Sequence, residues 1–359
     1  MILQDQNILF FTRTMGLGGT ENVILQLCEI FQPLVNKIVV CSCGGMNERA
    51  LENKGIKHYT IPDPEKKNIK NLISITKTVK RIIRDERISV IHTHHRMTAL
   101  YTQLLCIKRS CVIINTSHTS FYDKKLLTHI AFRDFNLIAC GEGVKKSLVG
   151  ALGFNPDRIT VICNGVKKNN EEKKPIKEIE NARKQGKHIF AVIGRLSEEK
   201  GVAYLIKAIP LLKTQKICCV VVGNGPEEKR LQQLVIELGV EDKVYFLGFR
   251  KDVSNVISQS DYLVQPSLQE GLPLVPIEAF AEGKTVIGTE IDGISEIIIN
   301  NRNGILVPAG NEIELAKAID YMNSIDRAIL EKEARETYER KYSFDVFANG
   351  YIDYYKALD

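Results

Sequence analysis

Two glutamates, Glu270 and Glu278, stand eight positions apart in the segment QEGLPLVPIEAFAEG, which is otherwise mostly apolar and contains two prolines. Glu270 precedes both prolines, so we expect it in a loop. Pro273 or Pro276 suits the first turn of a helix, where a missing N–H costs little, and Gly283 suits the position just beyond a helix end. Glu278 is therefore expected in the first or second turn of that helix.

The start of this helix is a candidate anion site, because the first N–H groups of a helix have no partner within it and carry the positive end of its dipole. Prolines donate no N–H. The donors expected to face an anion are the amides of Gly271, Leu272, Leu274 and Val275. The alternative is that Glu278 is only an acid near a helix start, which stabilises a helix by about 0.3–1 kcal/mol.

A second candidate loop contains two cations. The segment GRLSEEKG places Arg195 and Lys200 directly after an apolar run. The planar fork of an arginine and the point charge of a lysine together suit a diphosphate. The alternative is a solvated turn, which is the commoner situation for basic residues in isolation.

Two glycine-rich segments also follow apolar runs: GLGGTENV, which contains Gly16, Gly18 and Gly19, and VGNGPEEK. Glycines let a backbone approach a ligand closely, and the helix that follows favours an anion at its N-terminus. Neither segment has the third glycine of the G-x-G-x-x-G dinucleotide fingerprint, because Glu21 and Glu228 occupy that place. Turns that simply need glycine explain both segments equally well.

Four histidines, His92, His94, His95 and His118, lie near the ends of apolar runs. A zinc site needs ligands with matching geometry, and neither these histidines nor the nine cysteines have such a spacing. No metal is therefore expected. Loop histidines are usually hydrogen-bonded surface residues, but His118 stands out because its loop would face a ligand cleft.

The elements that must position these residues are short β-branched runs, each followed by an amphipathic helical stretch. Such near-continuous apolar runs are typical of parallel strands covered by helices on both faces. In the first half they lie at 7–11, 37–41, about 89–93, 111–115, 136–140 and 159–163, and in the second half they begin at 188, 217, 243, 261, 284 and 304. The polar stretch 167–187 separates the two series. We therefore expect an α/β protein of two doubly wound domains joined by a linker, with ligands beyond the carboxyl ends of the strands.

Composition agrees with a globular protein of two domains, with 359 residues, 44% hydrophobic and 26% charged. The N-terminus lacks the features of a signal peptide, and no stretch reaches the ~18 apolar residues of a membrane span, which predicts a cytoplasmic protein. Residues 1–174 carry 26 Lys and Arg against 15 Asp and Glu, or +11, and residues 175–359 carry 23 against 28, or −5. A basic half suggests an anionic partner such as a membrane surface, nucleic acid or phosphates.

Much of this positive charge lies on one amphipathic stretch, residues 66–87. Its expected apolar stripe is Ile69, Leu72, Ile73, Thr76, Val79 and Ile83, and its cations are Lys66, Lys67, Lys70, Lys77, Lys80, Arg81 and Arg84. One interpretation is a helix packed on its sheet with a solvated basic face. The sharper hypothesis is peripheral attachment to anionic lipid at the inner face of the plasma membrane, at roughly 1 kcal/mol per near-surface cation.

Taken in order, the segments resemble the retaining glycosyltransferases of family 4 over nearly the whole chain, most strongly from 188 to 310. The resemblance rests on GLGGTENV (16–23), NTSHT (115–119), VICNGV (161–166), GRLSEEKG (194–201), VGNGPEEKRLQQL (222–234), KVYFLGFRKDV (243–253), SLQEGLPLVPIEAFAEGKTVIGT (267–289), GISEII (293–298) and NGILVP (303–308). Each motif alone is weak, whereas the ordered set with its E-x₇-E spacing is specific. The resemblance implies the GT-B fold, in which two Rossmann-like domains face a central cleft. Residues 1–170 would form the acceptor domain, with a C-terminal helix at about 343–359 packing back on it, and residues 187–340 the domain that binds a nucleotide-sugar donor.

The resemblance also implies a role for each matching residue of the second domain. Arg195 and Lys200 would hold the donor diphosphate, Glu278 would bind the ribose hydroxyls, and Glu270 would contact the transferred sugar. The amides within 271–275 would meet the sugar or a phosphate.

Other positions complete the implied site. Phe249 and Arg250 would edge the base, Gly18 and Gly19 would approach the phosphates from the first domain, and His118 would lie near the sugar and the acceptor. The residues assigned to catalysis on this basis are Glu270, His118, Arg195 and Lys200.

The chain departs from the family pattern at two places. Pro273 stands where a second glycine is usual, which changes the stiffness of the loop, and Thr119 stands where an acid often follows the loop histidine. No D-x-D triplet occurs, which agrees with metal-independent chemistry and no cofactor. Charge on the leaving diphosphate would instead be stabilised by Arg195, Lys200 and a helix N-terminus.

The resulting prediction is a retaining transferase that moves a hexose or N-acetylhexosamine from a nucleotide-diphosphate sugar, with UDP favoured over GDP. The acceptor would be a glycan, lipid-linked, in the synthesis of cell-surface polysaccharide or glycolipid, and nucleic acid is not expected as a partner. Two alternatives remain: a nicotinamide-dependent oxidoreductase, which the doubly wound pattern allows, and a non-catalytic protein that binds nucleotide sugars.

Overall fold

The computed structural model describes residues 1–66, 68–105, 110–120, 123–169 and 172–358. The chain divides into two compact units. Unit 1 contains Met1–Asn164 and Phe347–Asp359, and unit 2 contains Gly165–Val346. Within the described residues, no helix is both long enough and apolar enough to span a membrane.

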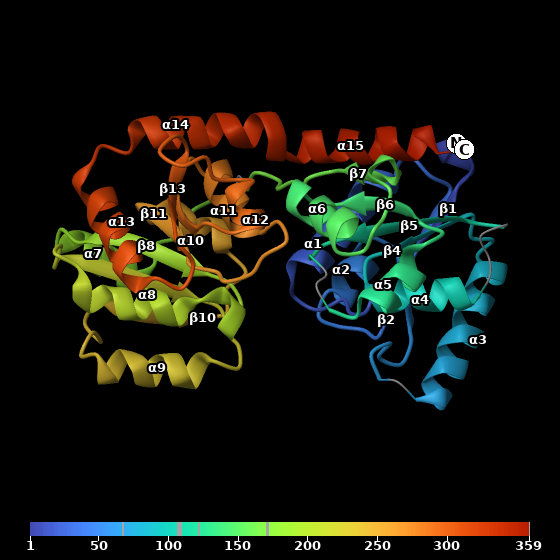
Figure 1. The fold of residues 1–359 in the computed structure, drawn as a ribbon, viewed down its shortest axis with the longest axis horizontal. Coiled ribbons are helices and arrows are strands. Elements are labelled where there is room, and N and C mark those ends of the chain that lie inside the picture. The colour runs from blue at the N-terminus through green and yellow to red at the C-terminus, as the bar shows by residue number, and fades with distance from the viewer. Residues whose placement is uncertain (67, 106–109, 121–122, 170–171, 359) are drawn as a thin grey trace. The chain divides into compact units, whose positions relative to one another are not determined.

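Unit 1 is built on a parallel sheet with helices around it, coloured mostly blue to green in Figure 1. Its seven strands, within its described part, run in the order β3-β2-β1-β4-β5-β6-β7. Leu9 in an interior strand pairs with Val39 on one side and Ile91 on the other. The strands are β1 (Asn7–Phe11), β2 (Lys37–Ser42), β3 (Lys57–Thr60), β4 (Val90–Thr93), β5 (Val112–Ser117), β6 (Asn136–Ala139) and β7 (Ile159–Val161). The helices are α1 (Gly19–Phe31), α2 (Glu48–Asn53), α3 (Ile69–Asp85), α4 (Arg96–Leu104), α5 (Lys125–Phe132), α6 (Glu142–Gly150) and α15 (Phe344–Ala357), the last from Phe347 onward.

Unit 2 repeats this topology with six parallel strands in its described part, in the order β10-β9-β8-β11-β12-β13. Phe190 in the central strand pairs with Cys219 and Tyr262. The strands are β8 (His188–Ile193), β9 (Ile217–Val222), β10 (Val244–Gly248), β11 (Tyr262–Gln265), β12 (Val286–Thr289) and β13 (Gly304–Val307). The helices are α7 (Lys177–Lys184), α8 (Val202–Ala208), α9 (Glu228–Glu237), α10 (Val253–Gln259), α11 (Leu274–Ala281), α12 (Asp292–Ser295), α13 (Glu312–Ser324) and α14 (Ala328–Thr337).

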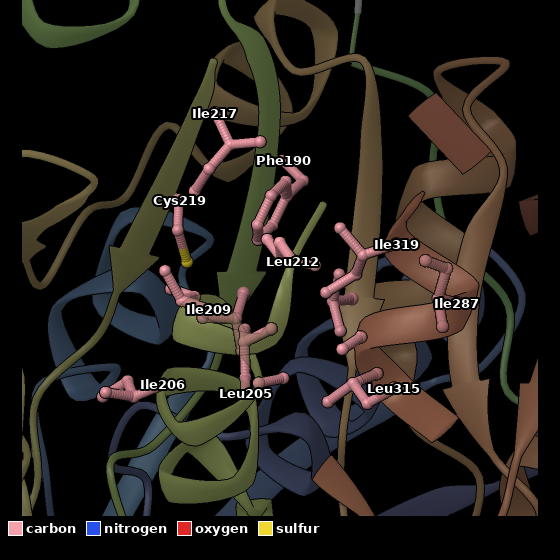
Figure 2. Close-up of a cluster of buried hydrophobic side chains, with 14 of the residues drawn as sticks. Phe190, Leu205, Ile206, Ile209, Leu212, Ile217, Cys219, Ile287, Leu315 and Ile319 are labelled. Atoms are coloured by element: carbon pink, nitrogen blue, oxygen red, sulfur yellow. The ribbon is translucent and has the colours of Figure 1, made fainter. Parts of the chain in front are cut away.

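The core of unit 2 lies between its sheet and the helices that cover it. Figure 2 shows Phe190 and Cys219 from the sheet with Leu205 of α8 and Leu315 and Ile319 of α13, all buried. Fully burying a side chain such as Leu or Phe contributes about 1.5–3 kcal/mol, so this cluster is a large part of what holds the strand ends in place. The predicted α/β fold of two parallel, doubly wound sheets is confirmed.

Three details differ from the sequence-based expectations. The edge strand β3 was not among the expected strands. Its residues are only half-buried or exposed, so its sequence lacks the continuous apolar run on which the other strands were predicted. The polar stretch 167–187 is not simply a linker, since α7 lies within it and buries Ile179 and Ala182. The predicted apolar stripe of α3 is also wrong.

Helix α3 packs on unit 1 through Ile75, Val79 and Ile82, of which only Val79 belongs to the predicted stripe. Ile69, Leu72 and Ile73 are instead exposed, by 75%, 39% and 49%. The first turns of this helix therefore present apolar side chains to solvent, among the exposed cations Lys66, Lys70 and Lys77. Lys67, another of the predicted cations, lies outside the described residues.

Each sheet has one place where the strand order reverses, and this is where ligands bind in doubly wound folds. In unit 1 it lies between β1 and β4, and in unit 2 between β8 and β11. The loops that leave β8 and β11 contain Arg195, Lys200 and Glu270, so the topology of unit 2 gathers these residues at one switch point.

Candidate active site

The loop that follows β8 is held in place by glycines that allow its backbone to pass close to its neighbours. Gly201 has φ +65°, and a Cβ there would stand 2.0 Å from the carbonyl oxygen of Pro266 in the loop after β11. Gly223 and Gly225, from the segment VGNGPEEK, pass equally close to the carbonyl oxygens of Gly194 and Leu196. These two glycines are therefore explained by packing between loops.

Lys200 and Glu270 form an ion pair across this switch point. The Lys200 ammonium donates to Oε1 of Glu270 at 2.7 Å, and the carboxylate side chain is only 9% exposed. Gln265 Nε2 and Ser267 Oγ donate to the same oxygen, at 3.0 and 2.8 Å. All the hydrogen bonds recorded for this carboxylate within the described residues reach Oε1, so Oε2 is the oxygen left for a ligand.

Arg195 is exposed at the beginning of the same loop. Its guanidinium makes no hydrogen bond or ion pair with the described residues, unlike Lys200. The pKa of the nearby Glu199 carboxyl is lowered mainly by a hydrogen bond from Ser197, with smaller contributions from the charges of Lys200 and Arg195. Arg195 is therefore a solvated cation beside a paired one, an arrangement that leaves its guanidinium open to an anionic ligand.

The expected helix after β11 is present. Helix α11 begins at Leu274, with Pro273 at its N-cap and Pro276 in its first turn. Gly283 follows the helix end with φ +72°. Glu270 lies in the preceding loop and Glu278 in the second turn, as predicted.

The loop before α11, which contains Gly271 and Leu272, is buried, and Leu274 and Val275 are half-buried. The segment after β12 packs closely against this loop: a Cβ at Gly293 would stand 2.0 Å from the carbonyl oxygen of Gly271. The four predicted amide donors therefore lie on a well-supported turn into the helix N-terminus.

Glu278 is a carboxyl group without a counter-charge. Its side chain is half-buried and makes no hydrogen bond or ion pair with the described residues. Desolvation raises its pKa to about 7. Burial of a carboxylate without hydrogen bonds destabilises the fold, and such groups concentrate where a ligand supplies the missing partner.

Phe249 and Arg250 follow β10, two strands away from β8. Gly248 turns the chain with φ +64°, and the Phe249 side chain is 45% exposed. Arg250 forms a two-pronged ion pair with Asp252, with N–O distances of 3.0 and 2.6 Å, which lowers the pKa of that carboxyl. Of these two residues, Phe249 is therefore the one whose exposed side chain is available to contact a ligand.

In unit 1, Gly18 is the N-cap of α1 and Gly19 its first residue. The carboxylate of Glu21 folds back over this helix start, where Oε1 accepts a hydrogen bond from Thr14 and Oε2 would lie 2.5 Å from a Cβ at Gly18. A phosphate approaching Gly18 would therefore require Glu21 to move aside.

His118 lies just beyond the end of β5 and is half-buried. Its Nε2 lies 3.0 Å from Nδ1 of His94, and burial lowers its pKa to about 4. His118 is thus a neutral imidazole at pH 7. His118 belongs to unit 1, whereas Glu270 belongs to unit 2.

Sequence reasoning missed two residues of these two clusters, and it named a third, His94, without connecting it to His118. Gln265 and Ser267 lie within the apolar run DYLVQPS, and a buried glutamine at the end of a strand was the available signal. His94 carries no distinguishing mark among the histidines of the sequence, although it contacts His118 directly. Among the described residues, no three His, Cys, Asp or Glu side chains gather as they would around a metal ion.

Comparison with known proteins gives the same division of the chain. The family described as Glycosyl transferases group 1 matches residues 173–340, and the one described as Glycosyltransferase Family 4 matches residues 17–169. Together the two matches cover most of the sequence.

Three relatives are similar over much of the chain. An uncharacterised glycosyltransferase of Methanocaldococcus jannaschii is 30% identical over 63% of this chain and 60% of its own length. A human protein that forms part of phosphatidylinositol N-acetylglucosaminyltransferase is 26% identical over 80% and 62%. The Escherichia coli UDP-Gal:alpha-D-GlcNAc-diphosphoundecaprenol alpha-1,3-galactosyltransferase is 25% identical over 74% and 72%. The chain thus spans about three fifths of the length of the first two.

Solved structures agree on the fold. A glycosyltransferase from Rickettsia africae has a TM-score of 0.85 at 22% identity, covering 98% of each chain. HepE of Anabaena, in complex with UDP-glucose, has a TM-score of 0.84 at 21% identity and covers 98% of this chain and 100% of its own. These neighbours share both parallel sheets, which is the GT-B arrangement.

Proposed function

Because this chain belongs to glycosyltransferase family 4, whose members transfer sugars with retention, we propose that it moves a hexose or N-acetylhexosamine from a UDP-sugar to a lipid-linked glycan. The observation that carries the proposal is the pairing of Lys200 with Glu270 at the switch point of unit 2, together with the unpartnered carboxyl of Glu278 on the helix that follows. A nicotinamide-dependent oxidoreductase is excluded by the family, and a purely binding protein would not need this set of groups.

Three groups support the proposed position of the donor. Oε2 of Glu270 accepts hydroxyls of the transferred sugar, because its partner oxygen is already fixed by Lys200, Gln265 and Ser267. Glu278 accepts the ribose hydroxyls, which supply the hydrogen bonds that its carboxylate lacks. Phe249 lies against the base. Neighbouring strands are 4.7–4.9 Å apart and β10 is two strands from β8, so their ends are about 10 Å apart. This distance is roughly the length of the nucleoside that would link the diphosphate at β8 to a base at Phe249.

Catalysis in this proposal is electrostatic. When the bond between the sugar and the diphosphate breaks, negative charge grows on the leaving nucleoside diphosphate. The exposed guanidinium of Arg195, the ammonium of Lys200 and the N-terminus of α11 stabilise that charge, and the last two are held by contacts within unit 2 before the reaction. Glu270 supports this arrangement by holding the ammonium in place. Neither glutamate needs to act as a nucleophile.

UDP is the proposed nucleotide because the descriptions of two similar proteins name a UDP-sugar. HepE was crystallised with UDP-glucose, and the Escherichia coli relative transfers galactose from UDP-Gal. That relative acts on a sugar linked to a lipid diphosphate, and the human relative forms part of a phosphatidylinositol N-acetylglucosaminyltransferase. By analogy with these two relatives, the proposed acceptor is lipid-linked and the proposed pathway is the synthesis of cell-surface polysaccharide or glycolipid.

The surface of α3 supports contact with a membrane that carries such an acceptor. Ile69, Leu72 and Ile73 are exposed at its beginning, and exposed Lys70 and Lys77 lie close by in sequence. Apolar side chains surrounded by cations suit the interface of an anionic bilayer. Residues 1–174, with their charge of +11, reinforce this attraction.

The test is a transfer assay with UDP-glucose, UDP-galactose, UDP-GlcNAc and their GDP and ADP counterparts, each with a GlcNAc-diphospho-polyprenol acceptor in mixed micelles. We expect release of UDP and a new disaccharide-lipid with one UDP-sugar. Consumption of a GDP- or ADP-sugar alone would refute the choice of UDP, and transfer to a free oligosaccharide at the same rate would refute the lipid-linked acceptor.

Membrane contact is tested separately, by co-sedimentation with vesicles of phosphatidylglycerol and phosphatidylcholine. The variant Ile73→Asn should bind less, and binding of the wild type should fall as salt rises. Ile329→Asn is the matched control, since Ile329 is 77% exposed but lies on α14 of unit 2. Equal binding of the two variants would argue against the proposed role of α3.

A further inference from the structure

Three histidine rings of unit 1 form a stack at the carboxyl ends of β4 and β5. His92 and His94 have ring centroids 4.3 Å apart with 28° between their planes, and His94 and His118 are 5.3 Å apart with 21° between theirs. Only His118, at one end, keeps a substantial part of its surface exposed. The stack therefore joins a buried pair of imidazoles to a residue proposed to lie near the transferred sugar.

The buried end of the stack is anchored on both sides of its ring. His92 Nδ1 lies 2.8 Å from the hydroxyl of Tyr355, and its Nε2 lies 2.8 Å from Oγ1 of Thr116. Oγ1 of Thr116 is also 3.0 Å from the hydroxyl of Tyr351, so α15 is tied to the sheet here. Because both nitrogens of His92 are bonded, its ring cannot rotate without breaking this network.

His94 differs from His92 because only one of its nitrogens has a partner. Its Nδ1 faces Nε2 of His118 at 3.0 Å. Its Nε2 is buried and makes no hydrogen bond with any described residue. The ring is held between His92, Phe10 and His118, an apolar and aromatic environment in which a charged imidazolium is strongly disfavoured and its pKa falls well below the usual value.

This asymmetry determines where the protons lie. In a neutral imidazole, one nitrogen carries a hydrogen and the other accepts. If the hydrogen of His94 were on Nε2, a buried N–H would have no acceptor, and orphaned buried N–H groups are rarer than under-used acceptors. The favoured arrangement has the hydrogen of His94 on Nδ1, from which it donates to Nε2 of His118. His118 must then carry its own hydrogen on Nδ1.

We propose that His94 is a positioning residue that fixes His118 as its Nδ1–H tautomer, so that His118 offers a hydrogen-bond donor, and not a base, to its ligand. The group that it recognises is thus an oxygen acceptor, such as a sugar hydroxyl oxygen or a phosphate oxygen of the donor. Nδ1 of His118 makes no hydrogen bond with the described residues, which leaves it available for this contact. The assignment of a ligand to His118 rests on the proposed function, whereas the tautomer does not.

The tautomer is observed directly by long-range ¹H–¹⁵N correlation spectra of protein labelled with ¹⁵N-histidine, without substrate. The seven histidines are assigned by single substitutions. We expect the tautomer of His118 with its hydrogen on Nδ1 to be populated about ten times more, or higher, than the tautomer with its hydrogen on Nε2. A bare Nδ1 in the wild type overturns the proposal, and this measurement does not depend on any variant folding.

Two variants test whether His94 is the cause. His94→Phe keeps the stack but removes the donor, so the Nδ1–H preference of His118 should be lost. His94→Asn retains a donor near the position of Nδ1 and should preserve it. His129→Phe, which alters a histidine that stacks on Phe154 elsewhere in unit 1, is the control and should leave His118 unchanged. An unchanged His118 spectrum in His94→Phe overturns the proposal.

Turnover then separates this inference from the proposed function. Loss of a residue that orients a reacting group typically lowers activity about tenfold or more, so kcat should fall in His94→Phe and recover in His94→Asn. If the tautomer changes as expected while kcat does not, the positioning by His94 stands and the assignment of His118 to the transfer site is refuted.

Discussion

Replacing Glu278 with glutamine should stabilise the protein and weaken its binding of UDP at the same time. The carboxyl is half-buried, and desolvation raises its pKa from 4.5 to about 7. At 1.36 kcal/mol per pKa unit this shift corresponds to a ceiling of about 3 kcal/mol, and solvent that still reaches the side chain reduces it to about half. Glu278→Gln keeps the shape of the side chain and removes the charge.

The sign of the effect follows from the direction of the shift. Between pH 4.5 and about 7 the folded protein holds a proton at Glu278 that the unfolded chain has released, so the stability contributed by this group is present below pH 4.5 and lost as pH rises through 7. Glu278→Gln should match the wild type near pH 4.5 and exceed it by about 1.5 kcal/mol at pH 8. For a unit of this size that is a rise in Tm of about 3–6 °C.

Binding should change in the opposite direction. If only the ionised carboxylate accepts the ribose hydroxyls, a free-state pKa of about 7 predicts that the affinity of the wild type for UDP rises about tenfold from pH 6 to pH 8. Glu278→Gln should bind more weakly at pH 8 and lack this rise, apart from the titration of UDP itself, which both proteins share.

The assays are scanning calorimetry without ligand and titration calorimetry with UDP, each at pH 4.5, 6 and 8 where the protein is soluble. Glu290→Gln, an exposed acid of unit 2, is the control and should stay within about 0.5 kcal/mol of the wild type. A Glu278→Gln protein that is no more stable than the wild type at pH 8 and binds UDP equally well would refute the reasoning.

Other substitutions test the rest of the site. Lys200→Ala and Arg195→Ala should each lower kcat about 10²-fold or more, because each removes a group that stabilises the leaving diphosphate; near-normal turnover in both would contradict their assignment. Gly201→Ala should destabilise unit 2 by more than Gly239→Ala, measured by urea unfolding, because both have positive φ but only a Cβ at Gly201 would meet a backbone oxygen, at 2.0 Å. Phe249→Ala should weaken the binding of UDP by about 1–3 kcal/mol, the usual contribution of a base stacked on an aromatic ring, and should leave binding of inorganic pyrophosphate unchanged; an equal loss for both ligands would place the ring elsewhere.

Much of the fold was predictable because its strands are continuous apolar runs. The segment ICCVVV is buried along its whole length as β9, and such a run is hard to accommodate except in a sheet covered on both faces. The strand β3 was missed for the opposite reason: the segment KHYT lies at the sheet edge, where one side of the strand needs no apolar partner.

Helix faces were harder to predict than helices. On α3, Ile69, Leu72 and Ile73 have the spacing of a buried stripe, yet Ile75, Val79 and Ile82 are the residues that are buried. Both sets repeat at helical intervals, and only the position of the helix over its sheet selects one of them. The same limit applied to α7, where Ile179 and Ala182 supply a short buried face within a strongly charged sequence.

The sequence predicted which loops and which residue types form the site. It did not predict which of these residues contact one another. Proline and glycine positions located α11 and separated the loop residue Glu270 from the helical residue Glu278. The pairing of Lys200 with Glu270, 70 positions along the chain, depends on the order of strands β8 and β11 and could not be inferred from either segment. His94 was one of the four histidines considered, but its contact with His118 was not predicted because that contact joins neighbouring strands.

The most direct test of the central claim is the stereochemistry of the product formed from a UDP-sugar. With the preferred α-linked UDP-hexose and a GlcNAc-diphospho-polyprenol acceptor, the anomeric ¹H coupling of the isolated product reports its configuration. A retaining transferase that uses the site at Lys200, Glu270 and Glu278 gives an α-linked product and one equivalent of UDP, and the Lys200→Ala variant loses both. A β-linked product, or UDP-sugar left unconsumed by the wild type, would contradict the account.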